Sequence, residues 1–264
     1  MSAAPIRLEQ RDGLAIITLA NPPLNLVTLA LRQALDEALE QALGVHRTQG
    51  LRALIVTGAG ERAFCCGSDV SEFPPLMEPG KVVPGKLGPE NATFNKLAAF
   101  PAPTIAAVNG LAFGGGLEMA CCCDLIVADD VARLCLPEVK LGLIPGSGGP
   151  VRLIRRIGEA RAREMMLLAD PIDARTALDW GLINRITPKG EALAGALKLA
   201  GRLEGRSPSA LHLCKQAIEL AFNQSDNDAI ANSLALSDIA FSSPDAREGL
   251  RAFQAKASPH FTHG

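Results

Sequence analysis

One stretch of the chain, residues 103–149, constrains its fold more than any other. Three consecutive glycines at positions 114–116 separate two apolar runs, and two glutamates, Glu118 and Glu138, stand in largely uncharged surroundings. Glycine at three successive positions costs conformational entropy and gives up side-chain packing. The backbone at these positions must therefore be accessible without side chains, either to a ligand or for close contact with another element.

The apolar runs around the glycines predict one compact αβ unit. Thr104–Val108 is short and rich in β-branched and small apolar residues, which predicts a buried strand. The apolar residues after the glycines predict a buried helix with Glu118 in its first turn. Leu125–Ala128 predicts another strand, and Arg133–Leu136 an extended piece that leads to Glu138. The two carboxylates are 20 residues apart on different elements, so we expect them to face each other across a cleft.

The start of that helix offers free backbone N–H groups to a negatively charged or polarised oxygen. The helix dipole adds to their effect, and only glycine lets a ligand come so close to the backbone. Close packing against another element is the alternative interpretation of the glycines. A carboxylate in an apolar helix, such as Glu118, needs a partner or has its pKa raised, and a pKa near neutrality suits a general acid or base. A solvated charge at the helix N-terminus is the alternative for this residue.

Composition narrows the functional class. A chain of 264 residues can bury a large core, as one big domain or as one domain with a smaller appendage. The formal net charge of −2, with no basic run, argues against nucleic-acid and acidic-membrane partners. We find no transmembrane span or secretory signal and expect a cytoplasmic protein. We interpret all seven cysteines as structural and expect no metal site, because they lack paired C-x-x-C spacing.

The first third of the chain predicts a largely parallel sheet. A hairpin is expected around Asp12-Gly13, followed by a helix over Asn25–Leu43 that Thr28 can cap. Leu51–Thr57 then predicts a buried strand. A strand, helix, strand order of this kind indicates a right-handed crossover between parallel strands.

Residues 74–89 are rich in Pro, Gly and Lys, have no periodicity, and predict a mobile flap. Within them, Gly80–Leu87 matches most of a phosphate-binding G-x-x-x-x-G-K motif. We reject a nucleotide site, because Leu87 stands where Ser or Thr should bind magnesium, Pro79 replaces the preceding strand, and no helix is expected directly after it.

The second half of the chain is mainly helical. We expect a core domain over residues 1–195 and a helical oligomerisation region over residues 196–264, because the last apolar stripes exceed what one subunit would cover. The expected helices are 151–157, 159–169, 174–180, 191–203, 207–223, 226–241 and 244–256.

These motifs resemble the crotonase superfamily and, within it, the enoyl-CoA hydratases. The match covers nearly the whole length and rests on five segments. They are Asn21-Pro22-Pro23 with Asn25, AFCCGSDV at 63–70, PTIAAVNGLAFGGGLEMACCCDLIVA at 103–128, LPEVKLGLIPGSGG at 136–149, and REGLRAF with Lys256 near the end.

The resemblance implies an α/β fold with a ββα spiral core and a helical C-terminal trimerisation region. It implies an enoyl-CoA hydratase, in which water adds across the 2,3 double bond of an acyl thioester. The backbone N–H groups of Ser68 and Gly115 would form an oxyanion hole for the thioester oxygen. Glu118 would act as base and Glu138 as acid, although which glutamate does which is open.

The resemblance also implies an acyl-CoA substrate, with coenzyme A as part of the substrate and no separate cofactor. A homotrimer or a homohexamer, made as a dimer of trimers, is the expected assembly. Phe253 and Lys256 resemble adenosine contacts made to a neighbouring subunit. The remaining expected substrate contacts are Leu26, Ala63, Cys66, Gly67, Asp69, Val70, Gly114, Pro137 and Gly146.

Other functions can be weighed against this one. A short-chain dehydrogenase needs a tyrosine acid, and the chain has no tyrosine. A Ser-His-Asp hydrolase is disfavoured, because Ser147 has Pro145 where the nucleophile motif needs Gly. The same fold also hosts isomerases, decarboxylases and hydrolases of acyl-CoAs, and non-catalytic or RNA-binding members, so these stay open. The histidines lie in no suggestive context; they are His46, His212, His260 and His263.

Overall fold

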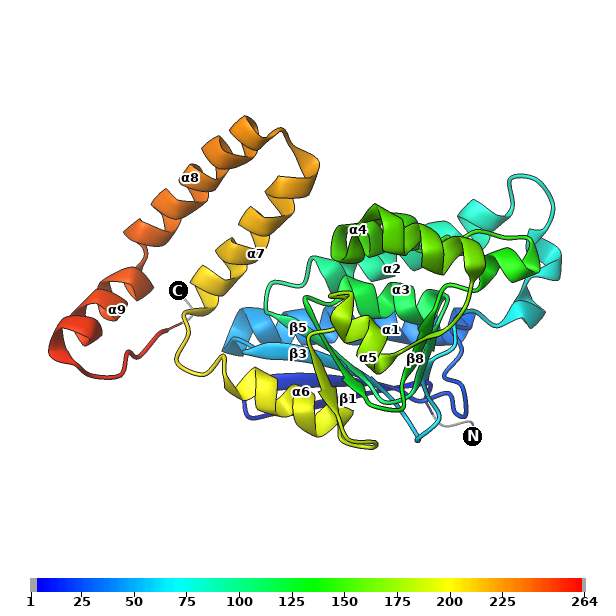
Figure 1. Cartoon of the computed structure of the whole chain (residues 1–264). Helices are drawn as coiled ribbons and strands as arrows, with labels where there is room; N and C mark the ends of the chain where they lie inside the picture. Colours follow the sequence, from blue (N-terminus) through cyan, green and yellow to red (C-terminus); the bar gives the residue numbers. More distant parts are fainter. Residues whose placement is uncertain (1–3, 263–264) are drawn as a thin grey trace.

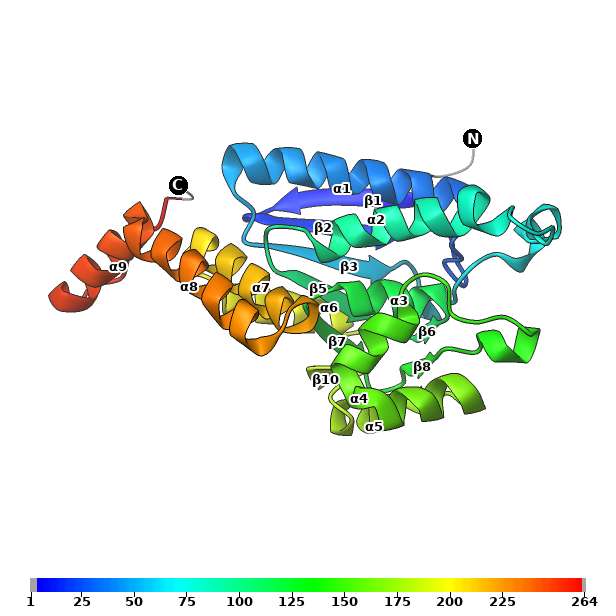
Figure 2. The same ribbon diagram turned by 90° about the horizontal axis from the view of Figure 1, so that it is seen from above.

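Two β-sheets organise the chain, and the computed structural model describes them within residues 4–262 (Figures 1 and 2). The larger sheet has the strand order β1-β2-β3-β5-β7-β10 and the smaller one β4-β6-β8-β9. The larger sheet contains β1 (Ile6–Arg11), β2 (Leu14–Leu19), β3 (Ala53–Gly58), β5 (Thr104–Val108), β7 (Leu125–Asp129) and β10 (Arg185–Thr187). The smaller sheet contains β4 (Ala63–Cys65), β6 (Leu111–Phe113), β8 (Arg133–Cys135) and β9 (Ile172–Asp173).

The larger sheet confirms the expected hairpin and crossover. β1 and β2 are antiparallel, and the turn between them places Asp12 and Gly13 at positive φ. α1 (Leu29–Gln49) then connects β2 to β3, which lie parallel. The helix begins and ends later than the expected 25–43. Thr28 caps it as expected, because its side chain accepts a hydrogen bond from the Leu31 amide at 3.1 Å.

The chain then repeats one unit three times. In each repeat a strand of the larger sheet is followed by a short strand of the smaller sheet and then by a helix. The strand pairs are β3-β4, β5-β6 and β7-β8, and the helices that follow them are α2 (Gly88–Ala98), α3 (Gly115–Cys122) and α4 (Gly149–Leu168). Because β4, β6 and β8 are parallel, the turns that leave these three strands lie along one edge of the smaller sheet. This is the expected ββα spiral.

Helices cover both faces of the larger sheet. Leu54 and Val56 belong to the cluster under α1 and α2, whereas Ile55 packs with the alanines of α6 (Ala192–Gly201) on the opposite face. Successive strand residues point to opposite faces, so a strand buried on both sides is apolar throughout. α5 (Ala174–Asp179) lies beside the smaller sheet (Figure 2).

The segment expected to be a flap is largely helical. Within it, Pro74–Leu76 and Val83–Leu87 form short helical turns, and the second leads directly into α2. The expectation that no helix follows Gly80–Leu87 was therefore wrong, whereas the mobility of the segment stays a prediction. Proline at the first turn of a helix loses no hydrogen bond, so a Pro-rich stretch can start one. The nucleotide-loop interpretation still fails, because residues 83–87 are themselves helical.

The last three helices extend away from the core (Figures 1 and 2). α7 (Pro208–Asn223) and α8 (Asp226–Ser242) pack side by side, and α9 (Pro244–Ala255) follows. Lys215 of α7 contacts the core by donating to the Phe100 carbonyl at 2.8 Å and to Asp124 at 2.6 Å. α6 runs without a break through residues 195 and 196, so the domain division at that point stays a prediction.

We predict that Gly116→Ala destabilises the protein by about 1–3 kcal/mol, because the new methyl group would collide with the Cys65 carbonyl on β4. Gly44→Ala in α1 is the matched control. Outside its own helix, no described residue reaches within 4 Å of a methyl group there, so this variant should gain about 0.5–1 kcal/mol. Urea unfolding measures both. Equal stability of the two variants would contradict the close approach of α3 to β4.

Candidate active site

The three glycines at the start of α3 serve three different purposes. Gly114 has a positive φ of 51°, and a side chain there would lie 2.8 Å from Oε1 of Glu138. Gly115 is the first residue of α3, so its N–H has no partner within the helix. Gly116 packs against the Cys65 carbonyl. Close packing, one of the two interpretations of this motif, therefore holds for Gly116, and the binding of a ligand to the free N–H of Gly115 stays a prediction.

The turn that carries Ser68 lies directly beside Gly115. It is held against residues 24–27, since the Cys66 amide donates to the Leu24 carbonyl at 3.0 Å and the Val27 amide to the Gly67 carbonyl at 2.8 Å. Gly67 has a φ of 84°, and a side chain on it would come within 3.3 Å of the Gly115 nitrogen. Among the described residues nothing accepts a hydrogen bond from the Ser68 N–H. The expected pair of backbone donors is thus brought together.

Glu118 is a buried carboxylate with two backbone partners. Its side chain points from the first turn of α3 toward residues 146–149, and only 2% of the residue is exposed. Its Oε1 accepts from the Ser147 amide at 2.8 Å and the Gly149 amide at 2.7 Å. Burial raises the pKa of Glu118 to about 7, against the lowering effect of the two amides and with a further rise from the charge of Glu138.

Glu138 begins a short helical turn, Glu138–Leu141, just after β8. Its Oε1 faces the Gly114 backbone, and its Oε2 is buried without a hydrogen-bond partner among the described residues. Burial raises the pKa of this carboxyl. Both glutamates thus lie at the N-terminal end of α3, Glu118 in its first turn and Glu138 against Gly114. That they face each other across a cleft stays a prediction.

A third carboxylate, Glu90 of α2, lies in the same place and was missed by the sequence analysis. It is 1% exposed and pairs with Lys86 at 2.6 Å. A side chain on Gly115 would come within 3.5 Å of its Oε1. The helical spacing of Glu90 with Thr93, Phe94 and Leu97, all buried, is the signal that could have identified it.

This arrangement provides the elements of acid–base chemistry on a polarised carbonyl. Two adjacent N–H groups, at Ser68 and Gly115, can hold one oxygen and stabilise negative charge on it. Two carboxyls of raised pKa, Glu118 and Glu138, stand beside that position, and the pKa of about 7 lets Glu118 exchange a proton near neutral pH.

Comparison with known proteins agrees with this geometry. Residues 9–264 match the profile of the enoyl-CoA hydratase/isomerase family. The chain belongs to this family. It is 36% identical to a probable enoyl-CoA hydratase of Mycobacterium bovis over 100% of both chains, and 32% identical to a crotonyl-CoA hydratase of Syntrophomonas wolfei over 99% of both. The crystal structure of an enoyl-CoA hydratase from Bacillus anthracis superimposes with a TM-score of 0.91 at 30% identity, covering 98% of this chain and 100% of the other.

The other residues that the family resemblance suggested are distributed unevenly. Leu26, Cys66 and Gly67 lie along the Ser68 turn. Asp69 caps the next helical turn by accepting from the Ser71 amide at 3.0 Å, and Val70 after it is exposed. These five residues therefore lie in or beside the turn that carries Ser68.

Three further expected contacts differ in their surroundings. Pro137 immediately precedes Glu138, and Gly146 contacts the side chain of Leu87 and accepts from the Asn91 amide group at 2.8 Å. Ala63 is fully buried in β4, so its side chain faces the core.

Phe253 and Lys256 are not brought to the site within one chain. Both lie at the end of α9, far from α3 (Figure 1), and Phe253 is 81% exposed. The idea that they reach the site of a neighbouring subunit stays a prediction.

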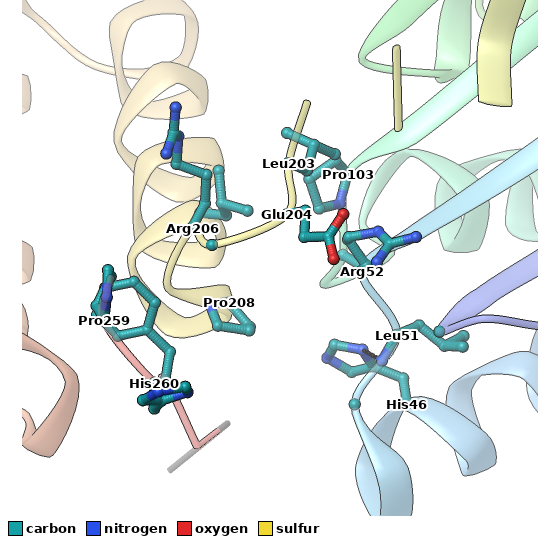
Figure 3. Close-up of a pocket in the computed structure, with 16 residues that line it drawn as sticks. His46, Leu51, Arg52, Pro103, Leu203, Glu204, Arg206, Pro208, Pro259 and His260 are labelled. Atoms are coloured by element: carbon teal, nitrogen blue, oxygen red, sulfur yellow. Dashed lines mark hydrogen bonds between the residues drawn. The ribbon is translucent and has the colours of Figure 1, made fainter. Parts of the chain in front are cut away.

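A separate cavity of about 320 Å³ lies between the core and the C-terminal helices (Figure 3). His46, Arg52, Glu204, Arg206 and His260 are among its lining residues, and Glu90, Glu118 and Glu138 are not. The hydroxyl of Ser147 donates to Glu90 and not to a histidine. This disfavours a Ser-His-Asp site at Ser147; His212 lies on α7, and His263 lies outside the described residues.

Residues 4–262 contain no group of three or more His, Cys, Asp or Glu side chains placed to hold a metal ion. Nor does this part of the chain contain a helix with the length and apolarity to cross a membrane.

We predict that Glu118→Gln stabilises the protein at pH 8. The folded-state pKa is raised from 4.5 to about 7, so the protonated form is favoured in the fold, and stability is lost as pH rises through 7. The variant should therefore gain on the order of 3 kcal/mol at pH 8, and this gain should vanish near pH 4. Urea unfolding across this pH range measures the difference, and a gain that does not depend on pH would contradict the raised pKa.

Proposed function

We propose that the protein is an enoyl-CoA hydratase, which adds water across the 2,3 double bond of a 2-enoyl-CoA to give a 3-hydroxyacyl-CoA. The observation that carries the proposal is the placement of Glu118 and Glu138 at the N-terminal end of α3, next to Ser68. Family membership and the names of the relatives agree with it.

The backbone donors stabilise the charge that develops during the addition. The thioester oxygen accepts hydrogen bonds from the N–H groups of Ser68 and Gly115, at the positive end of the α3 dipole. Attack of water at C3 moves negative charge onto this oxygen as an enolate. Preorganised donors of this kind contribute roughly 3 kcal/mol each to the transition state.

The carboxylates move the proton. Oε1 of Glu118 accepts hydrogen bonds from two amides, so we assign the attacking water to Oε2. Oε2 takes a proton from this water as the water oxygen bonds to C3. Glu138, whose pKa is raised by burial, acts as the acid and gives a proton to C2 as the enolate collapses. Transfer of the proton from Glu118 to Glu138 then restores the starting state, and one water has been added. The opposite assignment of acid and base fits the same geometry.

Isomerisation of the double bond is the second candidate. It needs one group that carries a proton between two carbons, and the oxyanion hole would serve it equally well. The presence of two carboxyls of raised pKa favours hydration, because water addition needs both a base and an acid.

We also propose that the active protein is a homotrimer or homohexamer. The last three helices carry large apolar side chains that one chain leaves exposed, including Ile218, Phe222, Ile230, Leu234, Phe241 and Leu250. Such a surface marks an interface. In that assembly, Phe253 and Lys256 would meet the adenosine part of the substrate bound to a neighbour.

We predict that the wild-type protein hydrates crotonyl-CoA and that Glu118→Gln and Glu138→Gln each lower kcat by about 10²–10⁴-fold. Glu164→Gln, on the exposed side of α4, is the matched control and should keep the wild-type rate. The assay follows the loss of enoyl absorbance. If both active-site variants turned over like the wild type, this function would be wrong; conversion to a 3-enoyl product instead of the hydroxyacyl product would favour the isomerase.

We predict that kcat/KM for hydration rises with pH through about 7. Glu118 must be deprotonated to act as base, and burial raises its pKa to about 7, so the active form is the minority below that pH. A profile of kcat/KM from pH 5 to 9 measures this. A rate that falls over the same interval would instead assign the acid role to Glu118.

A further inference from the structure

The turn of residues 146–149, which holds Glu118, depends on α2 for its position. Asn91 of α2 donates to the Gly146 carbonyl at 2.8 Å. The Ser147 hydroxyl donates to Glu90 of the same helix. Arg152 donates both to the Ser147 carbonyl, at 3.2 Å, and to the Asn95 side chain of α2. Three side chains of one helix, directly or through Arg152, thus fix this turn.

Ser147 connects two buried carboxylates through two different groups. Its N–H donates to Glu118 and its O–H donates to Glu90. Any shift of Ser147 relative to α2 therefore also moves one of the two donors that hold Glu118. A displacement of 1 Å at a reacting group can cost a hundredfold in rate.

Glu90 is itself held firmly. Lys86, one turn earlier, approaches it at 2.6 Å, and the two side chains are only 11% and 2% exposed. Taking two charges out of water is costly, and apolar residues of similar size often serve stability as well or better. A buried ion pair against the turn that carries the donors to Glu118 is therefore better explained by positioning than by stability.

We propose that Glu90 is a positioning residue: through the Ser147 hydroxyl it fixes the turn whose amides orient Glu118. The proposal rests on the proposed function for the reaction that Glu118 serves. The contact itself, from Glu90 to Ser147 to Glu118, is a property of the fold and can be tested without turnover.

The charges around Glu118 make two substitutions act in opposite directions on its titration. Glu138 and Glu90 face it with negative charge, while Lys86 beside Glu90 and Arg152 beside Ser147 carry positive charge. Removing the charge of Glu90 lowers the pKa of Glu118. Releasing the Ser147 hydroxyl weakens the amide contacts that favour the charged carboxylate, and so raises that pKa.

The experiment compares Glu90→Gln, Ser147→Ala and the double variant with the wild type, using crotonyl-CoA. Ser147→Ala should lower kcat about 10- to 100-fold with KM within a few-fold of wild type, and should shift the lower limb of the pH profile upward. In Glu90→Gln the glutamine side chain can still accept a hydrogen bond from the Ser147 hydroxyl. The lower limb of its pH profile should therefore shift to lower pH, with a smaller loss of kcat. The double variant should lose no more kcat than Ser147→Ala alone, because both act through one contact.

Lys96→Ala is the matched control, because Lys96 also lies on α2 and pairs with Asp36 and Glu40 at the exposed surface. It should leave both kcat and the pH limb unchanged. Glu90→Gln removes the charge that pairs with Lys86. If this variant does not fold for that reason, Ser147→Ala alone tests the proposal, since it keeps the buried ion pair. Wild-type kcat and an unmoved limb in Ser147→Ala would overturn the proposal.

Titration of the Glu118 carboxyl carbon by NMR in the full chain separates this proposal from the proposed function. If the wild type hydrates no enoyl-CoA, but the pKa of Glu118 still rises in Ser147→Ala and falls in Glu90→Gln, the function fails and the positioning stands. If hydration is normal and neither variant moves that pKa, the positioning fails and the function stands.

Discussion

The site depends on one interaction: a single oxygen of Glu118 accepts hydrogen bonds from two backbone N–H groups. Burial alone would keep this carboxyl protonated, and the amides of Ser147 and Gly149 oppose that effect. The outcome is a pKa of about 7, at which the group can both take and give a proton. Gly149 cannot be replaced without loss, because a side chain there would lie 2.8 Å from Oε1 of Glu118. The chemistry is thus set by the backbone of one turn as much as by the acid itself.

The spiral explains why residues so far apart in sequence meet. The turn that carries Ser68 follows β4, Gly115 follows β6, and Glu138 follows β8. These strands are parallel neighbours, so their carboxyl ends share one edge of the sheet, where open α/β folds generally place their sites. Each repeat of the fold contributes one group to the site, and the helix of the next repeat supplies its support: α3 carries Glu118, and the start of α4 holds it.

The sequence predicted the fold correctly where the local pattern of apolar residues and the tertiary contacts favour the same element. Continuous apolar runs indicated β3, β5 and β7, and the glycines followed by Glu118 indicated the start of α3. It failed where the pattern was weak. The short strands β6 and β9 give little periodicity, and the Pro and Gly residues before α2 concealed its helical spacing. Glu90 was missed because α2 was missed, and its contact with Ser147, 57 residues away, has no local signature. Which glycine serves packing and which serves a ligand also depended on contacts that only the fold shows.

The same site lowers the stability of the fold. Burial raises the pKa of both Glu118 and Glu138, and Oε2 of Glu138 has no partner among the described residues. A fold selected for stability alone would replace such groups, so their retention indicates that reactivity is what they serve. This cost lies at the edge of the smaller sheet, apart from the apolar clusters that pack on both faces of the larger sheet. Lys86 and Glu90 extend the polar cluster outward as a compensated pair.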